Sequence, residues 1–281
     1  MMRSFGKLFF IVFTLFFVYE TAAQGTKWKR RIIPNKLKTQ LFHSTQSINL
    51  PTSETLQKGD LFFEISHRFI PTIKSGSKEF WGFDGPANIR LALGYAFSDN
   101  SILTLGRSNL DNNFDLSFKH WLFESKIFSL PVTSSLLIGG SWSSDVNYSY
   151  ENDFDLFQFY GQLIFNTMIE KKLGIGLVPS YLYNSHIQCE TKEYSFTLGS
   201  YMQFYFSDMY SFIVEWNPTV TGWREDYNPV SFGFEIETGG HFFKIILTNS
   251  SDLNASQFLA GADKKFSDRD LRFGFNIIRI L

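Results

Sequence analysis

The sequence predicts a closed antiparallel transmembrane β-barrel of about twelve strands, an all-β fold. After residue 60, segment after segment alternates apolar and polar side chains with the period of two that a strand with two different faces requires. The connections between these segments are alternately short and long, as are the turns and loops of a membrane barrel. The composition agrees: 33 Phe and 18% aromatic residues accompany a mean hydropathy of -0.09, so apolar and polar residues are interleaved.

The strand pattern is clearest at residues 87–97, where Leu91 and Leu93 point to one face and Arg90 and Ala92 to the other. No segment shows convincing helical periodicity. The expected strands are 61–70, 87–97, 101–107, 113–123, 126–142, 155–165, 173–183, 193–206, 210–216, 230–236, 241–248 and 270–281.

The connections fall into two sets, which orient the barrel. The short ones are 98–100, 124–125, 168–172, 207–209 and 237–240; the long, polar ones are 71–86, 108–112, 143–154, 184–192, 217–228 and 249–269. In an outer-membrane barrel the short turns face the periplasm and the long loops face outward. Rings at the strand ends predict two aromatic girdles: Trp142, Tyr181, Tyr183, Tyr194 and Trp216 beside long loops, and Tyr95, Trp121, Tyr205 and Tyr210 beside short turns. A secreted β-sandwich shares the period of two and is the alternative fold.

The first residues read as a secretory signal. Arg3 and Lys7 precede an uncharged run at 8–18, and small residues follow at 21–23. The run is shorter than the roughly 20 residues of a membrane-spanning helix. We therefore expect a cleaved signal peptide at 1–23, a basic N-terminal periplasmic arm at 24–60, and an outer-membrane β-barrel at 61–281.

Four stretches resemble a known family: 59–69 (GDLFFEISHRF), 83–91 (FDGPANIRL), 248–250 (TNS) and 272–279 (RFGFNIIR). They are similar to the barrel proteins of domain-of-unknown-function family 5777, and the likeness runs from about Leu41 to the C-terminus. The resemblance implies an outer-membrane barrel of a Gram-negative bacterium and supplies no activity. Outer-membrane lipid is one expected partner of such a barrel. The barrel assembly machinery is the other, because the last strand resembles the C-terminal signal that this machinery reads.

Several functional classes have little support in the sequence. A net charge of -1 offers no case for nucleic acid, and the one cysteine, Cys189, excludes an intramolecular disulfide framework. Twelve-stranded barrels include a phospholipase, but none of the five histidines is followed two residues later by serine, as that enzyme would require: His43, His67, His120, His186 and His241. We expect neither a catalytic site nor a cofactor or metal site.

The residues of functional interest are charged side chains on the faces expected to line the lumen: Glu64, Arg68, Arg90, Asp115, Lys119, Glu215, Glu235, Lys244 and Arg272. In a water-filled pore this mixture of signs predicts weak ion selectivity and passage of small polar solutes. If the charges pair across the lumen, they close it instead. The first hypothesis is therefore a channel or transport protein for small solutes. The alternative is a structural or assembly barrel with a plugged lumen that binds partners through its loops or arm, and a lipid-acting enzyme stands third.

Overall fold

The computed structural model describes residues 39–145, 153–189 and 191–281. The expected signal peptide and the basic residues of the arm, at positions 27–38, lie outside the described residues. In the part of the chain that the structure describes, thirteen strands form one sheet. Their bounds are β1 Leu61–Phe69, β2 Ala87–Ser98, β3 Ser101–Ser108, β4 Asn113–Ile127, β5 Leu130–Ser143, β6 Phe157–Ile169, β7 Leu173–Tyr183, β8 Tyr194–Tyr205, β9 Tyr210–Trp216, β10 Thr219–Gly222, β11 Val230–Glu237, β12 His241–Thr248 and β13 Arg272–Ile280.

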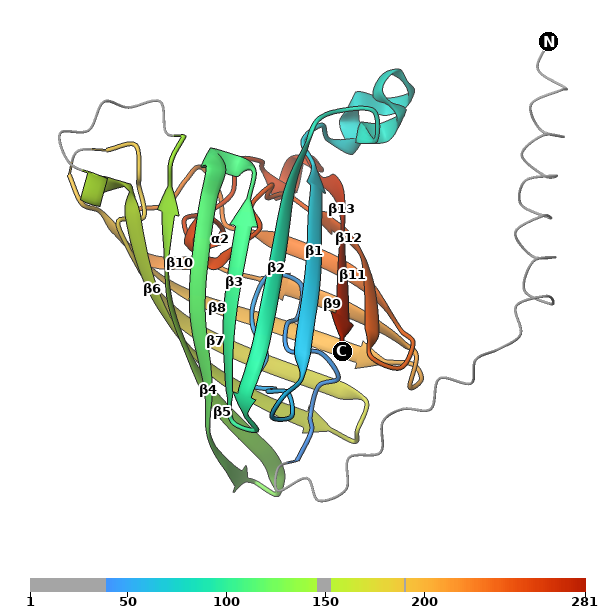
Figure 1. The fold of residues 1–281 in the computed structure, drawn as a ribbon. Coiled ribbons are helices and arrows are strands. Elements are labelled where there is room, and N and C mark those ends of the chain that lie inside the picture. The colour runs from blue at the N-terminus through green and yellow to red at the C-terminus, as the bar shows by residue number, and fades with distance from the viewer. Residues whose placement is uncertain (1–38, 146–152, 190) are drawn as a thin grey trace, which may run out of the picture. The chain divides into compact units, whose positions relative to one another are not determined.

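The sheet closes on itself as an antiparallel barrel (Figure 1). The first and last strands pair, with Ile65 opposite Ile277, and β8 pairs with both β9 and β10. Between β9 and β10 lie Asn217 and Pro218, and proline has no N–H to donate to a ladder. The two short strands therefore occupy the position of one interrupted strand in the ring. The closed twelve-strand barrel expected from the sequence is confirmed.

The barrel has an apolar outer face and a polar inner face. On β2 the exposed fractions of Leu93 and Tyr95 are 53% and 47%, whereas those of Ala92 and Ala96 are 3% and 0%. The same alternation recurs around the ring. A continuous band of exposed apolar side chains is the surface that a transmembrane barrel presents to lipid.

The β4–β5 hairpin differs from its expected form. The turn expected at 124–125 lies instead at Phe128 and Ser129, both of which have positive φ, as a two-residue hairpin turn requires. The pairing register shifts between Trp121 and Phe123, so one residue is left over as a bulge. Beyond the bulge, the inner and outer positions of β4 are exchanged. Glu124 and Ser125, which the sequence suggests as a turn, continue the strand and pair with Thr133 and Val132 of β5.

Two residues of the expected aromatic girdles, Trp121 and Tyr205, take inward positions. Trp121 pairs with Ser135, whose hydroxyl donates to the carbonyl of Ser53 inside the ring. Tyr205 is buried inside the ring, while Tyr95, Tyr210, Trp142 and Trp216 are exposed on the outside. The wider girdle pattern therefore holds at these positions. The hydroxyl of Tyr205 instead accepts a hydrogen bond from the backbone N–H of His43, at 3.4 Å.

Short helical turns occupy several connections: η2 Ile73–Gly82, η3 Leu110–Asn112, η4 Asp153–Leu156, α2 Ala255–Phe258 and η5 Phe266–Asp268. Within the described ranges, no helix has the length and hydropathy to cross a membrane. Figure 1 shows η2 projecting from the end of the barrel that carries the long loops, α2 inside the ring near that end, and the blue segment before β1 inside the ring nearer the short turns. The last two features determine what the lumen contains.

Candidate functional site

The candidate site is the lumen. The structure places all nine of the charged residues expected there at buried, inward-facing strand positions, with exposed fractions of 6% or less. Five are basic and four acidic, so the wall carries both signs. They are Glu64 and Arg68 on β1, Arg90 on β2, Asp115 and Lys119 on β4, Glu215 on β9, Glu235 on β11, Lys244 on β12 and Arg272 on β13.

Some of these charges pair along the wall. The Arg90 guanidinium donates to both carboxylate oxygens of Asp115, at 2.9 and 2.6 Å, and lies 3.3 Å from Glu64. The Lys244 ammonium lies 3.2 Å from the Glu235 carboxylate. Burial of a charge is tolerated when such partners replace water. Other lumen groups, among them Glu215 and Lys119, bind a chain segment that lies inside the barrel.

Residues 41–56, the inserted segment, lie inside the barrel. The expected periplasmic arm is therefore corrected for this part of its length: from Leu41 to Leu56 it contacts the inner wall. Its apolar side chains are buried there, each contributing about 1.5–3 kcal/mol when removed from water. These side chains are Leu41, Phe42, Ile48, Leu50 and Leu56.

The wall has spaces for these side chains at glycines. A Cβ built on Gly174 would lie 2.6 Å from the ring of Phe42, and one on Gly199 would lie 2.7 Å from Leu50. A third glycine, Gly233, faces Ile48 in the same way at 3.0 Å. Side chains at these three positions would occupy the volume that the inserted segment now fills.

One lumen carboxylate holds the middle of the inserted segment. Glu215 accepts hydrogen bonds from three consecutive backbone N–H groups, those of Ile48, Asn49 and Leu50, at 3.0–3.1 Å. The Asn49 side chain donates to the same carboxylate at 3.0 Å and accepts from Arg68 at 3.0 Å. Hydrogen bonds to a charged acceptor are stronger than those between neutral groups, so this cluster fixes the turn of the segment.

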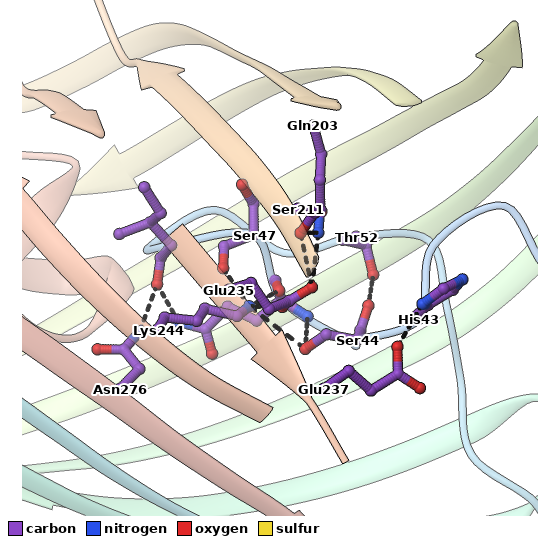
Figure 2. A network of polar contacts seen from close by, with 12 residues as sticks. His43, Ser44, Ser47, Thr52, Gln203, Ser211, Glu235, Glu237, Lys244 and Asn276 are labelled. Atoms are coloured by element: carbon purple, nitrogen blue, oxygen red, sulfur yellow. Dashed lines mark hydrogen bonds and ion pairs between the residues drawn. The ribbon is translucent and has the colours of Figure 1, made fainter. Parts of the chain in front are cut away.

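Two lumen lysines hold its carbonyl groups. Lys119 donates to the backbone oxygens of Thr45 and Thr52, at 2.9 and 3.1 Å. Lys244 donates to those of Gln46, at 2.5 Å, and of Ser47. Figure 2 shows Lys244 and Glu235 reaching from neighbouring strands toward Ser44 and Ser47 of the segment. Main-chain groups that lie outside any helix or sheet are thereby satisfied by the wall.

Further contacts hold the two ends of the segment. Nδ1 of His43 is hydrogen-bonded to Glu237 near the short turns (Figure 2). Ser53 donates its N–H to Asn166 at 2.6 Å, and its hydroxyl lies 2.6 Å from that of Thr133. The segment is therefore attached to several strands around the ring.

Residues 249–263, the inserted loop, fill the end of the lumen nearest the long loops. Phe258 and Leu259 are buried, and Phe258 joins the apolar cluster that contains Phe42 and Leu50. The Asp263 carboxylate receives a two-pronged hydrogen bond from Arg272, at 2.7 and 2.9 Å. Part of the long 249–269 connection therefore lies inside the lumen.

A cavity of about 80 Å³ separates parts of these two insertions. The inserted segment contributes Gln46 and Asn49, and the inserted loop contributes Asn254. The wall contributes charged side chains, Glu64, Arg90, Asp115 and Lys119, and apolar ones, among them Phe62, Ile102 and Leu137. The residual space therefore has a mixed polar and apolar lining.

Electrostatic strain is concentrated in the long loops. Burial, reinforced by the nearby carboxylates of Asp252 and Asp263, raises the pKa of Glu225 to about 8. Burial likewise raises the pKa of Asp252 to about 6. Glu225 lies beside the inserted loop, because its N–H donates to the carbonyl of Ala260 at 2.8 Å. Negative charge in these loops therefore opposes their packing.

The closed ring, its apolar outer band and its internally filled polar lumen define a membrane β-barrel. The chain belongs to the family described as membrane bound beta barrel domain (DUF5777), whose model matches residues 42–281. The resemblance found in the sequence is thus confirmed. The match begins at the start of the inserted segment, so the family domain includes it.

Solved structures with a similar fold include the NanC porin, which is 10% identical, covers 78% of this chain and 98% of its own, and has a TM-score of 0.48. The KdgM porin is 11% identical with the same coverages and a TM-score of 0.41. An outer membrane channel from Pseudomonas putida F1 is 12% identical, with coverages of 82% and 98% and a TM-score of 0.40. No curated protein sequence matches the chain.

Proposed function

We propose that this protein is an outer-membrane barrel for the passage of small polar solutes, closed at rest by its own inserted segment. In this orientation the short turns face the periplasm and the long loops face outward. The NanC and KdgM porins and an outer membrane channel share the fold at low identity. The argument itself rests on the lumen.

The observation that carries the proposal is the small size of the inward wall positions. A barrel closed by its own strands fills its lumen with side chains. Here glycines face the inserted segment, and many other inward positions hold small polar residues: Ser66, Thr133, Ser135, Ser141, Ser180, Ser195, Thr197, Ser211, Ser231 and Thr248. Displacement of the segment would therefore leave a wide, hydrated space in the part of the lumen that the inserted loop does not fill.

The attachment of the segment is suited to displacement. Its main chain is held by charged side chains, notably Glu215, Lys119 and Lys244, and water can hydrate these groups once the segment leaves. The exposed wall would carry five basic and four acidic groups. Such a mixture favours small polar solutes over strict selection of one ionic sign.

A plugged structural barrel is the second candidate, and a different observation favours it. Phe42 and Leu50 have no exposed surface, and they join Phe258 of the inserted loop in one apolar cluster. A permanent plug would be anchored in this way. The two functions differ in whether release of the segment produces conductance.

The test is planar-bilayer conductance of the full chain and of Glu215→Ala. The substitution leaves three backbone N–H groups without their acceptor, at about 1–3 kcal/mol for each of the two buried ones, those of Ile48 and Leu50. We expect a silent wild-type protein and stable, salt-dependent current steps in the variant. Glu215→Gln is the matched control: it removes the same charge but keeps an acceptor oxygen, so it should conduct less often.

Release of the segment is checked separately by hydrogen exchange at the amides of residues 48–50. If these amides lose protection in Glu215→Ala and no current appears, the channel proposal is wrong and the plugged structural barrel stands. If they lose protection and current appears, the segment is the closure of a channel.

A further inference from the structure

Two inward-facing arginines lie beside each other on the strands that close the barrel. Arg68 of β1 pairs with Gly274 of β13, and Arg272 is two residues further along β13 on the same face. Diagonal neighbours of this kind are within reach of each other's long side chains. Both are completely buried, with exposed fractions of 1% and 0%.

Each arginine has unused hydrogen-bonding capacity. The Nε–H groups of Arg68 and Arg272 are buried and without an acceptor in the structure. Within the described residues, Arg68 also forms no ion pair: its guanidinium donates to neutral oxygens of Asn49, Asn276 and the backbone. The carboxylates of Glu215, Glu64 and Asp252 act on Arg68 from a longer distance, without direct ion pairs. A buried guanidinium that has no directly bound carboxylate is a strong site for an oxyanion.

The inserted loop already supplies one anion to this place. Asp263 binds Arg272 through both carboxylate oxygens, in the geometry that arginine uses for carboxylate and phosphate. Asp263 is itself a third exposed, and it belongs to the loop and not to the wall. It therefore occupies the arginine site as a tethered group that a free oxyanion can replace.

We propose that Arg68 and Arg272 recognise the oxyanion group of a small solute, a carboxylate or a phosphate, and that Asp263 holds the Arg272 half of this site in the closed barrel. The inference rests on the proposed function and specifies its solute class. It also links the site to both insertions, because Arg272 holds the inserted loop through Asp263 and Arg68 holds the inserted segment through Asn49. An oxyanion that takes these donors loosens both.

The test is equilibrium binding to the full chain in detergent micelles, measured by titration calorimetry with acetate, inorganic phosphate and the neutral isostere acetamide. Asp263→Asn removes the tethered competitor and should tighten oxyanion binding by about tenfold. Arg272→Gln and Arg68→Gln should each weaken it by at least about tenfold. Arg279→Gln is the matched control, because Arg279 lies on the same strand with its side chain exposed, and it should change nothing.

The opposite directions of these changes separate recognition from damage to the fold, which would weaken binding in every variant. Tighter binding of acetate alone in Asp263→Asn assigns the site to carboxylates, and tighter binding of phosphate alone assigns it to phosphates. The proposal is overturned if Asp263→Asn leaves binding unchanged, or if acetamide binds as well as the anions. Binding is read without any current, so this result and the conductance of Glu215→Ala can fail independently.

Discussion

Leu50 of the inserted segment occupies the space beside Gly199 of β8 that any larger residue would need, with 2.7 Å between the Leu50 methyl carbon and a Cβ built on the glycine. Real Cβ atoms do not approach other atoms so closely, so one of the two groups must move. The backbone of Gly199 is held by its pairing with Val178 of β7, whereas Leu50 belongs to a segment held by side chains. A Cβ at this position would also lie 2.9 Å from Oδ1 of Asn217, so both Leu50 and the Asn217 side chain must yield.

Gly199→Val should displace the centre of the inserted segment. The loss of Leu50 burial destabilises the closed form by about 2 kcal/mol, and current steps should appear in planar bilayers. Gly161→Val is the control, because a Cβ at Gly161 meets nothing within 4 Å. Equal behaviour of the two variants would show that the glycine contact does not keep the lumen closed.

Asp115→Ala should strongly lower the free energy of unfolding of the barrel, without specifically displacing the inserted segment. Arg90 would lose its two-pronged partner, and breaking one half of a buried pair costs about 3–5 kcal/mol. Urea titration of the detergent-solubilised protein measures the change. Replacing the whole cluster with neutral residues of similar size, Arg90→Met with Asp115→Leu and Glu64→Gln, should recover most of the loss, because Glu64 also lies beside Arg90. A triple variant as unstable as the single one would refute the charge cluster as the cause.

The barrel and the positions of its lumen charges follow from the sequence because both depend on the period of two. Arg90 and Asp115 are assigned to the inner face simply by their place in an alternating strand. At Leu122 this rule fails locally, since a bulge reverses the alternation and nothing in the side chains marks it.

The inserted segment could not be predicted in the same way. Its apolar residues, among them Phe42, Ile48 and Leu50, follow neither strand nor helix spacing, because the wall and not a regular backbone pattern holds them. The available signal lay in the strands, where Gly174 and Gly199 leave room for large side chains from elsewhere. Gly139 and Gly176 make room in the same way for Tyr160 and Tyr201 of the wall, so inward glycines alone do not predict an insertion.

The packing of the inserted loop should weaken as the pH rises. The pKa of Asp252 is raised to about 6 and that of Glu225 to about 8. Below pH 4 both carboxyls are therefore protonated, and neither places a buried negative charge in the loops. Because both values lie above those of the unfolded chain, stability falls as the pH rises through about 4 to 8. Hydrogen exchange of the Ala262 amide, corrected for the intrinsic rate, should be faster at pH 9 than at pH 5.

The double variant Glu225→Gln with Asp252→Asn removes both titrating groups. It should abolish the pH dependence of exchange at Ala262 and leave the loop as protected at pH 9 as at pH 5. Retention of the full pH dependence would show that other groups, such as Asp263 with Arg272, control the loop.

The central claim, that the inserted segment closes a conducting barrel, can be tested with a removable lock. The hydroxyls of Ser53 and Thr133 lie 2.6 Å apart, so cysteines at these positions are placed to form a disulfide between segment and wall. The measurement is bilayer conductance of Glu215→Ala with Ser53→Cys, Thr133→Cys and Cys189→Ser, before and after reduction. We predict a silent oxidised protein that conducts on reduction; identical currents in the two states would contradict the account.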